Sequence, residues 1–312
     1  MITYIITGAT GLIGGALVDH LRRNDKNRLI LPVRNVLKAE RKFGKSHQLV
    51  YIEHDFSSDH SLNINENVDY IVHAACPTAS RYMVECPVET IDTIINGTRT
   101  VLQTARILHV KGMVFLSSME VYGTVPNDYD YIDEAIQGYV NPVTSRSSYP
   151  MSKRLAETMC HSYSKEYSVP VVIARLTQTF GPGVDVSHDM RVFAQFARCA
   201  RDCKNIILET EGRTKRMYLH TWDAVNAIML LLIKGMMGEA YNVANKDTYC
   251  SIREMAEFVK EQFSPSIDII VKKNENNFYL PEMHLPLSTD KMERLGWKPQ
   301  YGLREMFRAV IE

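Results

Sequence analysis

The sequence lacks the features that mark a protein for a membrane, a nucleic acid or the cell exterior. Its 312 residues include 36 basic and 36 acidic side chains, so no net charge draws the chain toward nucleic acid or an anionic membrane. The longest uninterrupted apolar run, Ala227–Ile233, is too short to cross a bilayer. Met1 leads directly into an apolar segment without a secretory leader, and we therefore expect a cytoplasmic protein.

Cysteine is also sparse, and the six cysteines show no metal-ligand pattern. Only Cys199 and Cys203 are close together, and no histidine accompanies them at the spacing of a zinc site. The sequence therefore predicts free thiols in a reducing compartment and no metal centre. With 45% hydrophobic and 23% charged residues, the composition is that of a folded domain and excludes a disordered or collagen-like chain.

The N-terminal half alternates short apolar runs with amphipathic helical segments. We expect strands at residues 2–7, 28–33, 49–53, 70–74, 113–117 and 169–175, and helices at 13–23, 87–109 and 149–167. The strands are almost wholly apolar, which is typical of a parallel sheet with helices on both faces. The alternation predicts an α/β fold with a doubly wound parallel sheet of the Rossmann type.

A glycine-rich turn joins the first expected strand to the first helix. Gly8, Gly11 and Gly14 recur at a spacing of three within the segment from Thr7 to Gly14. Glycines here allow a tight turn and let the backbone approach a pyrophosphate, which the free N–H groups and the dipole of the following helix then bind. In this context the motif predicts a dinucleotide site, with helix–strand packing as the alternative role of the glycines.

The end of the second strand indicates which dinucleotide is bound. NAD-binding proteins carry an acidic residue there, which accepts hydrogen bonds from the ribose 2′-hydroxyl, whereas this chain reads Leu31-Pro32-Val33-Arg34-Asn35. A guanidinium at Arg34 suits a 2′-phosphate and so favours NADP over NAD. A solvated surface charge and stacking on the adenine are the other roles open to Arg34. Asp55, just after the third strand, is placed to meet the adenine amine.

The pattern changes after Gly181-Pro182-Gly183. We expect helices at 191–202, 223–234, 252–263 and 303–311, and strands at 206–209, 241–244 and 267–271. The strand at 241–244 is expected to rejoin the main sheet. The sequence thus predicts a dinucleotide-binding domain of residues 1–176, to which 217–247 returns, and a smaller, interleaved C-terminal substrate lobe of 177–216 and 248–312.

Three further segments follow the glycine turn in a fixed order. Val72-His73-Ala74-Ala75 ends the fourth strand, Ser117-Ser118-Met119-Glu120-Val121-Tyr122-Gly123 ends the fifth, and Tyr149-Pro150-Met151-Ser152-Lys153 opens a long helix. With Arg175, Phe180-Gly181-Pro182-Gly183, Arg216-Met217-Tyr218-Leu219-His220 and Leu295-Gly296-Trp297-Lys298-Pro299, they resemble the extended short-chain dehydrogenase/reductase family, specifically its nucleotide-sugar epimerases, dehydratases and decarboxylases. The resemblance covers nearly the whole chain.

The resemblance implies an enzyme that moves a hydride between a sugar hydroxyl and a bound NAD(P). The substrate it implies is a nucleotide-diphosphate sugar. It also implies a homodimer formed through the helices at 87–109 and 149–167. No nucleic acid or membrane partner is expected.

The expected chemistry can be argued from Tyr149 and Lys153, which share one face of a helix because they lie one turn apart. A tyrosine with its usual pKa near ~10 is a poor base at neutral pH. An ammonium beside it, together with the positive nicotinamide, would favour the phenolate and lower that pKa. Tyr149 is then expected to take a proton from a sugar hydroxyl as the hydride leaves. The resemblance implies that Ser118 orients the reacting oxygen.

Glu120 is a further catalytic candidate. In the dehydratases that the chain resembles, an Asp-Glu pair eliminates water, but here Met119 stands in the place of the aspartate. A lone glutamate occurs in the sugar decarboxylases, and the segment from Lys153 to Thr158 resembles theirs. Acceptance of backbone N–H groups in a turn is the alternative role of Glu120.

The expected ligand contacts extend beyond these residues. The dinucleotide contacts are Gly8, Thr10, Gly11, Leu12, Ile13, Gly14, Arg34, Asp55, Phe56, Ala74, Ala75, Tyr149 and Lys153. The substrate contacts are Ser118, Met119, Gln178, Arg191 and Arg216, with Arg216 as a pyrophosphate clamp. Gln178 departs from the asparagine usual in the family, and Leu280-Pro281-Glu282-Met283-His284 stands where a second phosphate-contacting arginine is common.

Two other functions remain open at the level of sequence. Arg34 motivates an NADPH-dependent reductase of a nucleotide-linked sugar or ketose, which would consume its cofactor. A non-catalytic nucleotide-binding protein on the same fold would have lost Tyr149 or Lys153, and both are present. The sequence does not decide between epimerisation, dehydration and decarboxylation.

Overall fold

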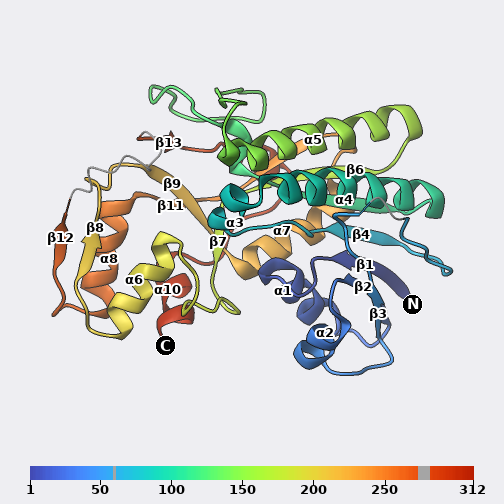
Figure 1. The fold of residues 1–312 in the computed structure, drawn as a ribbon, viewed down its shortest axis with the longest axis horizontal. Coiled ribbons are helices and arrows are strands. Elements are labelled where there is room, and N and C mark those ends of the chain that lie inside the picture. The colour runs from blue at the N-terminus through green and yellow to red at the C-terminus, as the bar shows by residue number, and fades with distance from the viewer. Residues whose placement is uncertain (59–60, 273–281) are drawn as a thin grey trace.

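A computed structural model describes residues 1–58, 61–272 and 282–312 and contains a seven-stranded parallel sheet in the order β10-β6-β5-β4-β1-β2-β3 (Figure 1). The strands are β1 (Ile2–Thr7), β2 (Asn27–Val33), β3 (Leu49–Glu53), β4 (Tyr70–His73), β5 (Gly112–Ser118), β6 (Val171–Leu176) and β10 (Ala240–Val243). The strand order reverses between β1 and β4, which is where doubly wound sheets bind their ligands.

Helices cover both faces of this sheet, as the apolar strands require (Figure 1). One face carries α1 (Leu12–Leu21), α2 (Val36–Phe43) and α7 (Thr221–Lys234), and the other carries α3 (Ser80–Glu85), α4 (Pro87–Leu108) and α5 (Ser148–Tyr167). Successive residues of β1 serve opposite layers, because Ile6 packs with the α1 side and Ile5 with the α4 side.

A second layer of structure lies beside the carboxyl ends of the main strands. A four-stranded sheet combines β7 (Gln178–Phe180), β9 (Lys215–His220), β11 (Asn245–Ser251) and β13 (His284–Leu285), and β8 (Ile206–Leu208) pairs with β12 (Ile269–Val271). The helices α6 (Val192–Arg201), α8 (Ile252–Phe263) and α10 (Leu303–Ile311) surround a core in which the Phe180 and Phe193 rings stack at 4.2 Å. The short helix α9 (Asp290–Arg294) packs near β10.

The predicted fold class is confirmed, and β10 joins the main sheet parallel to β6 as expected. Some elements were not predicted. Residues 36–43 form α2, whose Asn35 caps the N-terminus by accepting from the Lys38 N–H at 2.8 Å. Residues 215–220 form β9, which was not predicted as a strand. The division of the chain into two folding units stays a prediction.

Two further properties concern the described residues. None of their helices combines the length and the hydropathy that a bilayer crossing requires. All six cysteines are free thiols, and no group of histidine, cysteine, aspartate and glutamate side chains in the described ranges is arranged to hold a metal ion.

Candidate active site

The glycine turn lies in direct contact with the end of β4. Gly8 has φ +68, and a Cβ added there would meet the backbone of Ala74 at 2.6 Å and that of Ala75 at 2.7 Å. A Cβ on Gly14 would collide with the carbonyl of Gly8. Any larger residue would therefore push the two loops apart, and the glycines keep the bare backbone close to whatever binds above them.

Thr7 ties these two loops together. Its Oγ1 accepts from the backbone N–H of Ala74 at 3.1 Å and of Ala75 at 3.0 Å, and lies 2.8 Å from Nδ1 of His73. His73 is buried, and this burial lowers its pKa to about 3. The imidazole is therefore neutral at physiological pH and serves the structure of the loops.

The turn fits the pyrophosphate of a dinucleotide. Gly11 precedes α1 without a side-chain cap, so the first-turn N–H groups of Leu12 and Ile13 face outward with the positive end of the helix dipole. Lys42 of α2 reaches across, and its Nζ donates to the carbonyl oxygens of Thr10 at 3.1 Å and Gly11 at 3.3 Å. Bare backbone, unpaired donors and a fixed turn are what an anionic group at this place needs.

The expected adenosine end of the site lies beyond β2 and β3. Arg34 is exposed. The pKa of Asp55 is lowered, chiefly by its hydrogen bond from the Ser57 backbone and further by the charge of Arg34. Phe56 is buried, with its ring 5.9 Å from that of His73, so its side chain belongs to the sheet core. The ligand contacts expected of these residues stay predictions.

Ser118, Tyr149 and Lys153 meet at the carboxyl end of β5. Ser118 is the last residue of β5, and its hydroxyl lies close enough to the Tyr149 phenol to lower the pKa of that phenol. Lys153 is buried and its Nζ lies 5.8 Å from the centre of the Tyr149 ring. The chain thus brings together the three groups that the sequence predicted to act on the substrate, although their catalytic roles stay predictions.

The electrostatics of Tyr149 differ from the simplest expectation. Burial raises the pKa of its phenol well above the usual value, and Cys76 and Glu120 act in the same direction. The neighbouring Ser118 hydroxyl and the charge of Arg146 oppose that rise. Lys153 donates to the carbonyl oxygen of Leu116 at 2.7 Å. A phenolate at neutral pH therefore needs a further positive charge beside Tyr149.

Glu120 forms an ion pair at the edge of this group. It lies in the short helical turn η1 (Met119–Tyr122), and its Oε2 accepts from Nη2 of Arg146 at 2.6 Å. Arg146 comes from a second such turn, η2 (Ser145–Ser147), directly before α5. Its guanidinium lies 6.0 Å from the centre of the Tyr149 ring. Met119 is buried, so Glu120 alone contributes a carboxylate from this turn.

The expected substrate-binding residues differ in whether their side chains already have partners within the protein. Arg216 in β9 has a buried Nε with no hydrogen-bond partner among the described residues, as a clamp that awaits an anion would. Arg191 is already paired with Asp189, with Nη2 to Oδ2 at 2.5 Å. Gln178 begins β7 beside β9. These contacts stay predictions, and Leu280 and Pro281 lie outside the described residues.

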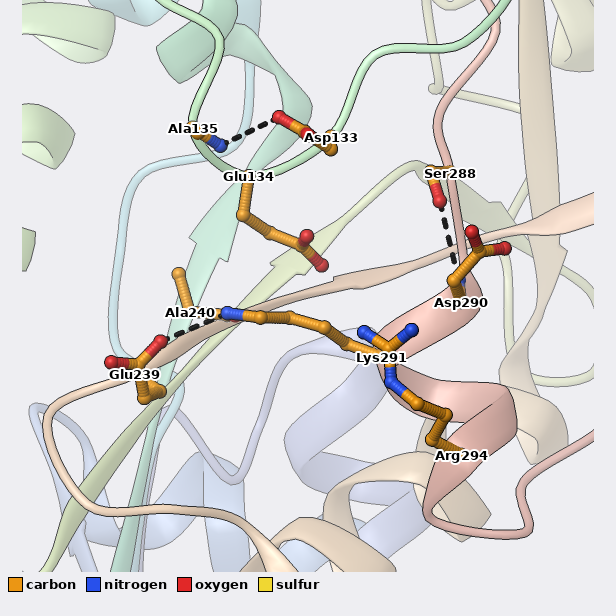
Figure 2. Close-up of a pocket in the computed structure, with 9 residues that line it drawn as sticks. All are labelled: Asp133, Glu134, Ala135, Glu239, Ala240, Ser288, Asp290, Lys291 and Arg294. Atoms are coloured by element: carbon orange, nitrogen blue, oxygen red, sulfur yellow. Dashed lines mark hydrogen bonds and ion pairs between the residues drawn. The ribbon is translucent and has the colours of Figure 1, made fainter.

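A cavity of about 440 Å³ lies elsewhere on the molecule (Figure 2). It opens at the start of β10, where Lys291 of α9 extends toward Glu239 and pairs with it at 2.9 Å. Glu134 and Asp290 add carboxylates to its wall. All strands of the sheet run parallel, so the start of β10 lies at the amino ends of the strands, whereas Tyr149 and the glycine turn lie at the carboxyl ends. The cavity is therefore at the opposite end of the sheet from the candidate active site. We do not assign it to the dinucleotide.

Sequence reasoning missed three residues of this region. Arg146 stands three residues before Tyr149, a helical spacing that could have drawn attention to it. Cys76 directly follows the Ala74-Ala75 segment and lies beside both Lys153 and Tyr149. Lys42 could not have been found, because its reach to the glycine turn depends on α2, which was not predicted.

Comparison with known proteins agrees with this geometry. The model of the NAD dependent epimerase/dehydratase family matches residues 4–244. A UDP-glucuronic acid decarboxylase of Arabidopsis thaliana, isoform 5, is 32% identical over 304 residues, which cover 96% of this chain and 86% of that protein.

Solved structures share the fold. A UDP-glucose 4-epimerase from Thermotoga maritima superposes with a TM-score of 0.83 at 19% identity, over 99% of this chain and 97% of that one. RMD from Pseudomonas aeruginosa, solved with NADPH, gives a TM-score of 0.79 at 22% identity, over 100% and 98% of the two chains.

Proposed function

The chain belongs to the NAD-dependent epimerase/dehydratase family, and on that premise we propose that it decarboxylates a nucleotide-linked uronic acid. Family membership makes it an NAD(P)-dependent enzyme that converts nucleotide sugars through transient hydride transfer. Net reduction of a carbonyl is not favoured, because the similar proteins are decarboxylases, dehydratases and epimerases, which return the hydride.

The observation that carries the choice of decarboxylation is the turn after β5. Buried Met119 occupies the place of the dehydratase aspartate, so the acid that would protonate a departing hydroxyl is missing. Glu120 remains, and it is bound to Arg146 beside Tyr149. A site with one carboxylate, one guanidinium and one phenol suits a substrate that itself brings a carboxylate. The relatives at about one-third identity are named for that reaction.

The chemistry of such a substrate follows from the position of its carboxyl group. Oxidation of the ring hydroxyl on the carbon β to that group makes a β-keto acid. Its carbon–carbon bond then breaks, CO₂ leaves, and the electron pair forms an enolate on the keto oxygen. A proton adds to the carbon that lost CO₂, and reduction restores the hydroxyl. The net change is one uronate and one proton converted to one pentose and one CO₂.

Each protein group in this scheme has a defined task. A nicotinamide held on the glycine turn would supply a reversible hydride acceptor for the sugar carbon. Tyr149 takes the hydroxyl proton and gives it back, and the neighbouring Ser118 hydroxyl holds the same sugar oxygen. Lys153, which donates a hydrogen bond to the Leu116 carbonyl, adds positive charge near the Tyr149 ring. Arg216 holds the pyrophosphate of the substrate with its unpaired Nε.

NADP is the dinucleotide that we infer for this site. The end of β2 carries exposed Arg34 where an acid would bind the 2′-hydroxyl of NAD. The charge of Arg34 helps to lower the pKa of the neighbouring acid, Asp55. Lys42, held against the glycine turn, adds a second positive charge to the dinucleotide site. A 2′-phosphate would find positive charge here, while a 2′-hydroxyl would find no acceptor at the strand end.

A homodimer formed through α4 and α5 completes the proposal. The two helices lie side by side on one face of the sheet (Figure 1). Their outer surface exposes Val88 by 61%, Ile91 by 41% and Leu155 by 50%. An apolar surface shared by two adjacent helices is suited to a second copy of itself. Light scattering of wild-type protein and of Leu155→Glu tests this, and a monomeric wild type would contradict it.

The proposed reaction is tested with a panel of nucleotide sugars. Purified protein is denatured to identify any released dinucleotide, and native protein is incubated with UDP-glucuronic acid, UDP-glucose and dTDP-glucose. Mass spectrometry should show loss of CO₂ from the uronate, with no accumulation of reduced nicotinamide in the absorbance spectrum. Conversion of a neutral sugar alone, by epimerisation or loss of water, would contradict decarboxylation while leaving the family chemistry intact.

A further inference from the structure

Arg146 holds an unusual position between two functional groups. It lies directly before α5 and its side chain is 28% exposed. Through Nη2 it donates to Glu120, and its guanidinium carbon lies 6.0 Å from the centre of the Tyr149 ring. The charge of Arg146 reaches the Tyr149 phenol strongly enough to oppose the rise of its pKa. Arg146 therefore places a positive charge beside the phenol that is proposed to take the proton of the sugar hydroxyl.

One edge of this guanidinium is unused. Nη1 of Arg146 is buried and has no hydrogen-bond partner among the residues of the described ranges. Buried donors on a charged group are nearly always paired, because a buried N–H that has lost water and gained no acceptor is unfavourable. A planar guanidinium offers donors along more than one edge, so Arg146 can serve Glu120 and a second acceptor together.

We propose that Arg146 is the specificity residue that receives the carboxylate of the substrate sugar. This inference rests on the proposed function, because it identifies the uronate as the ligand of that same site. A carboxylate is the acceptor that matches a guanidinium edge best in shape and charge. Glu120 already pairs with this guanidinium, and its negative charge repels the substrate carboxylate. The attraction between Arg146 and the substrate is therefore weaker than that of an arginine without an acidic partner. Loss of CO₂ then removes the charge that Arg146 held.

The test compares an acidic and a neutral ligand of otherwise equal structure. Binding of UDP-glucuronic acid and of UDP-glucose is measured by calorimetry for wild type, Arg146→Gln, Arg146→Lys and Glu120→Gln, each with its dinucleotide bound. The control is Arg81→Gln, which removes an exposed arginine that pairs with Glu85. Thermal unfolding and dinucleotide content confirm that each variant is folded.

Arg146→Gln should weaken UDP-glucuronic acid binding by roughly tenfold to a hundredfold and leave UDP-glucose within about threefold of wild type. Arg146→Lys should recover part of the loss. Glu120→Gln should tighten uronate binding by several-fold or leave it unchanged, because it removes a like charge and frees a second guanidinium edge. Arg81→Gln should bind both ligands as wild type does.

Equal losses of both ligands in Arg146→Gln would overturn the inference, since a merely structural ion pair would disturb the whole site. An unchanged uronate affinity would overturn it as well. So would a loss in Glu120→Gln as large as that in Arg146→Gln. Equal affinity of wild-type protein for UDP-glucuronic acid and UDP-glucose would also overturn it. Failure of the proposed function looks different, because wild-type protein would then not release CO₂ from UDP-glucuronic acid.

Discussion

The Lys153 ammonium donates to the carbonyl oxygen of Leu116 at 2.7 Å and lies 4.7 Å from the centre of the Phe115 ring. These contacts hold a buried positive charge at the end of β5, beneath Tyr149, without a hydrogen bond to the phenol itself. Lys153 can therefore favour the phenolate through its field, and the bound dinucleotide must supply the rest, because burial alone raises the pKa of Tyr149.

Replacement of Lys153 by methionine removes this charge while keeping much of the side-chain volume. We expect kcat to fall by roughly 10²- to 10⁴-fold, since proton transfer by a positioned group contributes about that much. The rise of kcat with pH should also move to higher pH, because Tyr149 would lose a nearby positive charge. Steady-state kinetics across pH measure both effects. Lys165→Met, on the exposed side of the same helix, is the matched control and should behave as wild type.

Two glycines with similar φ angles separate the effect of backbone strain from that of a close approach. Gly8 has φ +68 and its Cβ would meet Ala74 at 2.6 Å, while Gly44 has φ +76 and nothing within 4 Å. Gly44→Ala should lower the free energy of unfolding by about 1–3 kcal/mol, because φ +76 with ψ −176 is a backbone region that is almost exclusive to glycine. Gly8→Ala should lower it further and lose the dinucleotide. Urea denaturation and measurement of bound dinucleotide test this, and equal losses in the two variants would contradict it.

Buried neutral His73 should make the protein less stable in acid. Its pKa is about 3 in the folded chain, against about 6.5 when unfolded, so below about pH 6.5 only the unfolded chain takes up the proton. The free energy of unfolding should therefore fall as pH decreases from about 6.5 toward 3, by up to about 1.4 kcal/mol per pH unit from this residue.

His73→Gln should lose that part of the slope, whatever its effect on stability at neutral pH. Urea denaturation at several pH values gives the slope for each variant. Exposed His47 offers the control, and His47→Gln should keep the wild-type slope. A wild-type slope in His73→Gln would show that another group is responsible for the acid sensitivity.

Replacement of Arg34 by alanine tests the inferred cofactor. We expect the affinity for NADP to fall by roughly tenfold or more and that for NAD to stay the same, because only NADP carries a 2′-phosphate. Arg41→Ala, on the exposed side of α2, controls for a general change of surface charge. Titration of each dinucleotide into the stripped protein measures the affinities. Tighter NAD than NADP binding by wild type would contradict the inference.

Much of this fold could be predicted because its buried strands appear in the sequence as short, almost wholly apolar runs. Ile2–Thr7, Leu49–Glu53 and the helices Ile252–Phe263 and Leu303–Ile311 were predicted with their observed bounds. Each combines a strong apolar pattern with a clear start or stop. Residues 36–43 gave no such signal, because Ala39 and Phe43 are the buried residues of an otherwise charged segment. The pairing of β9 with β11 and β13 was equally out of reach, since it depends on contacts distant in sequence.

In the candidate site, too, local features could be predicted and contacts between distant segments could not. The spacing of Tyr149 and Lys153 and the glycines at 8, 11 and 14 were readable from the sequence, because local geometry alone fixes their relation. The Arg146–Glu120 pair was not, since its partners are 26 residues apart and come together through two short helical turns. The direction of the pKa shift of Tyr149 was also not predictable, because it depends on burial by elements across the fold.

The most direct test of the central claim follows a deuterium atom. UDP-glucuronic acid labelled at the sugar carbon whose hydroxyl is oxidised is converted by wild type and by Tyr149→Phe, and the product is examined by mass spectrometry and NMR. We predict that the wild-type product retains the deuterium while no reduced dinucleotide accumulates, and that Tyr149→Phe is slower by roughly 10²- to 10⁴-fold. A product without deuterium, or an unimpaired Tyr149→Phe, would contradict the account.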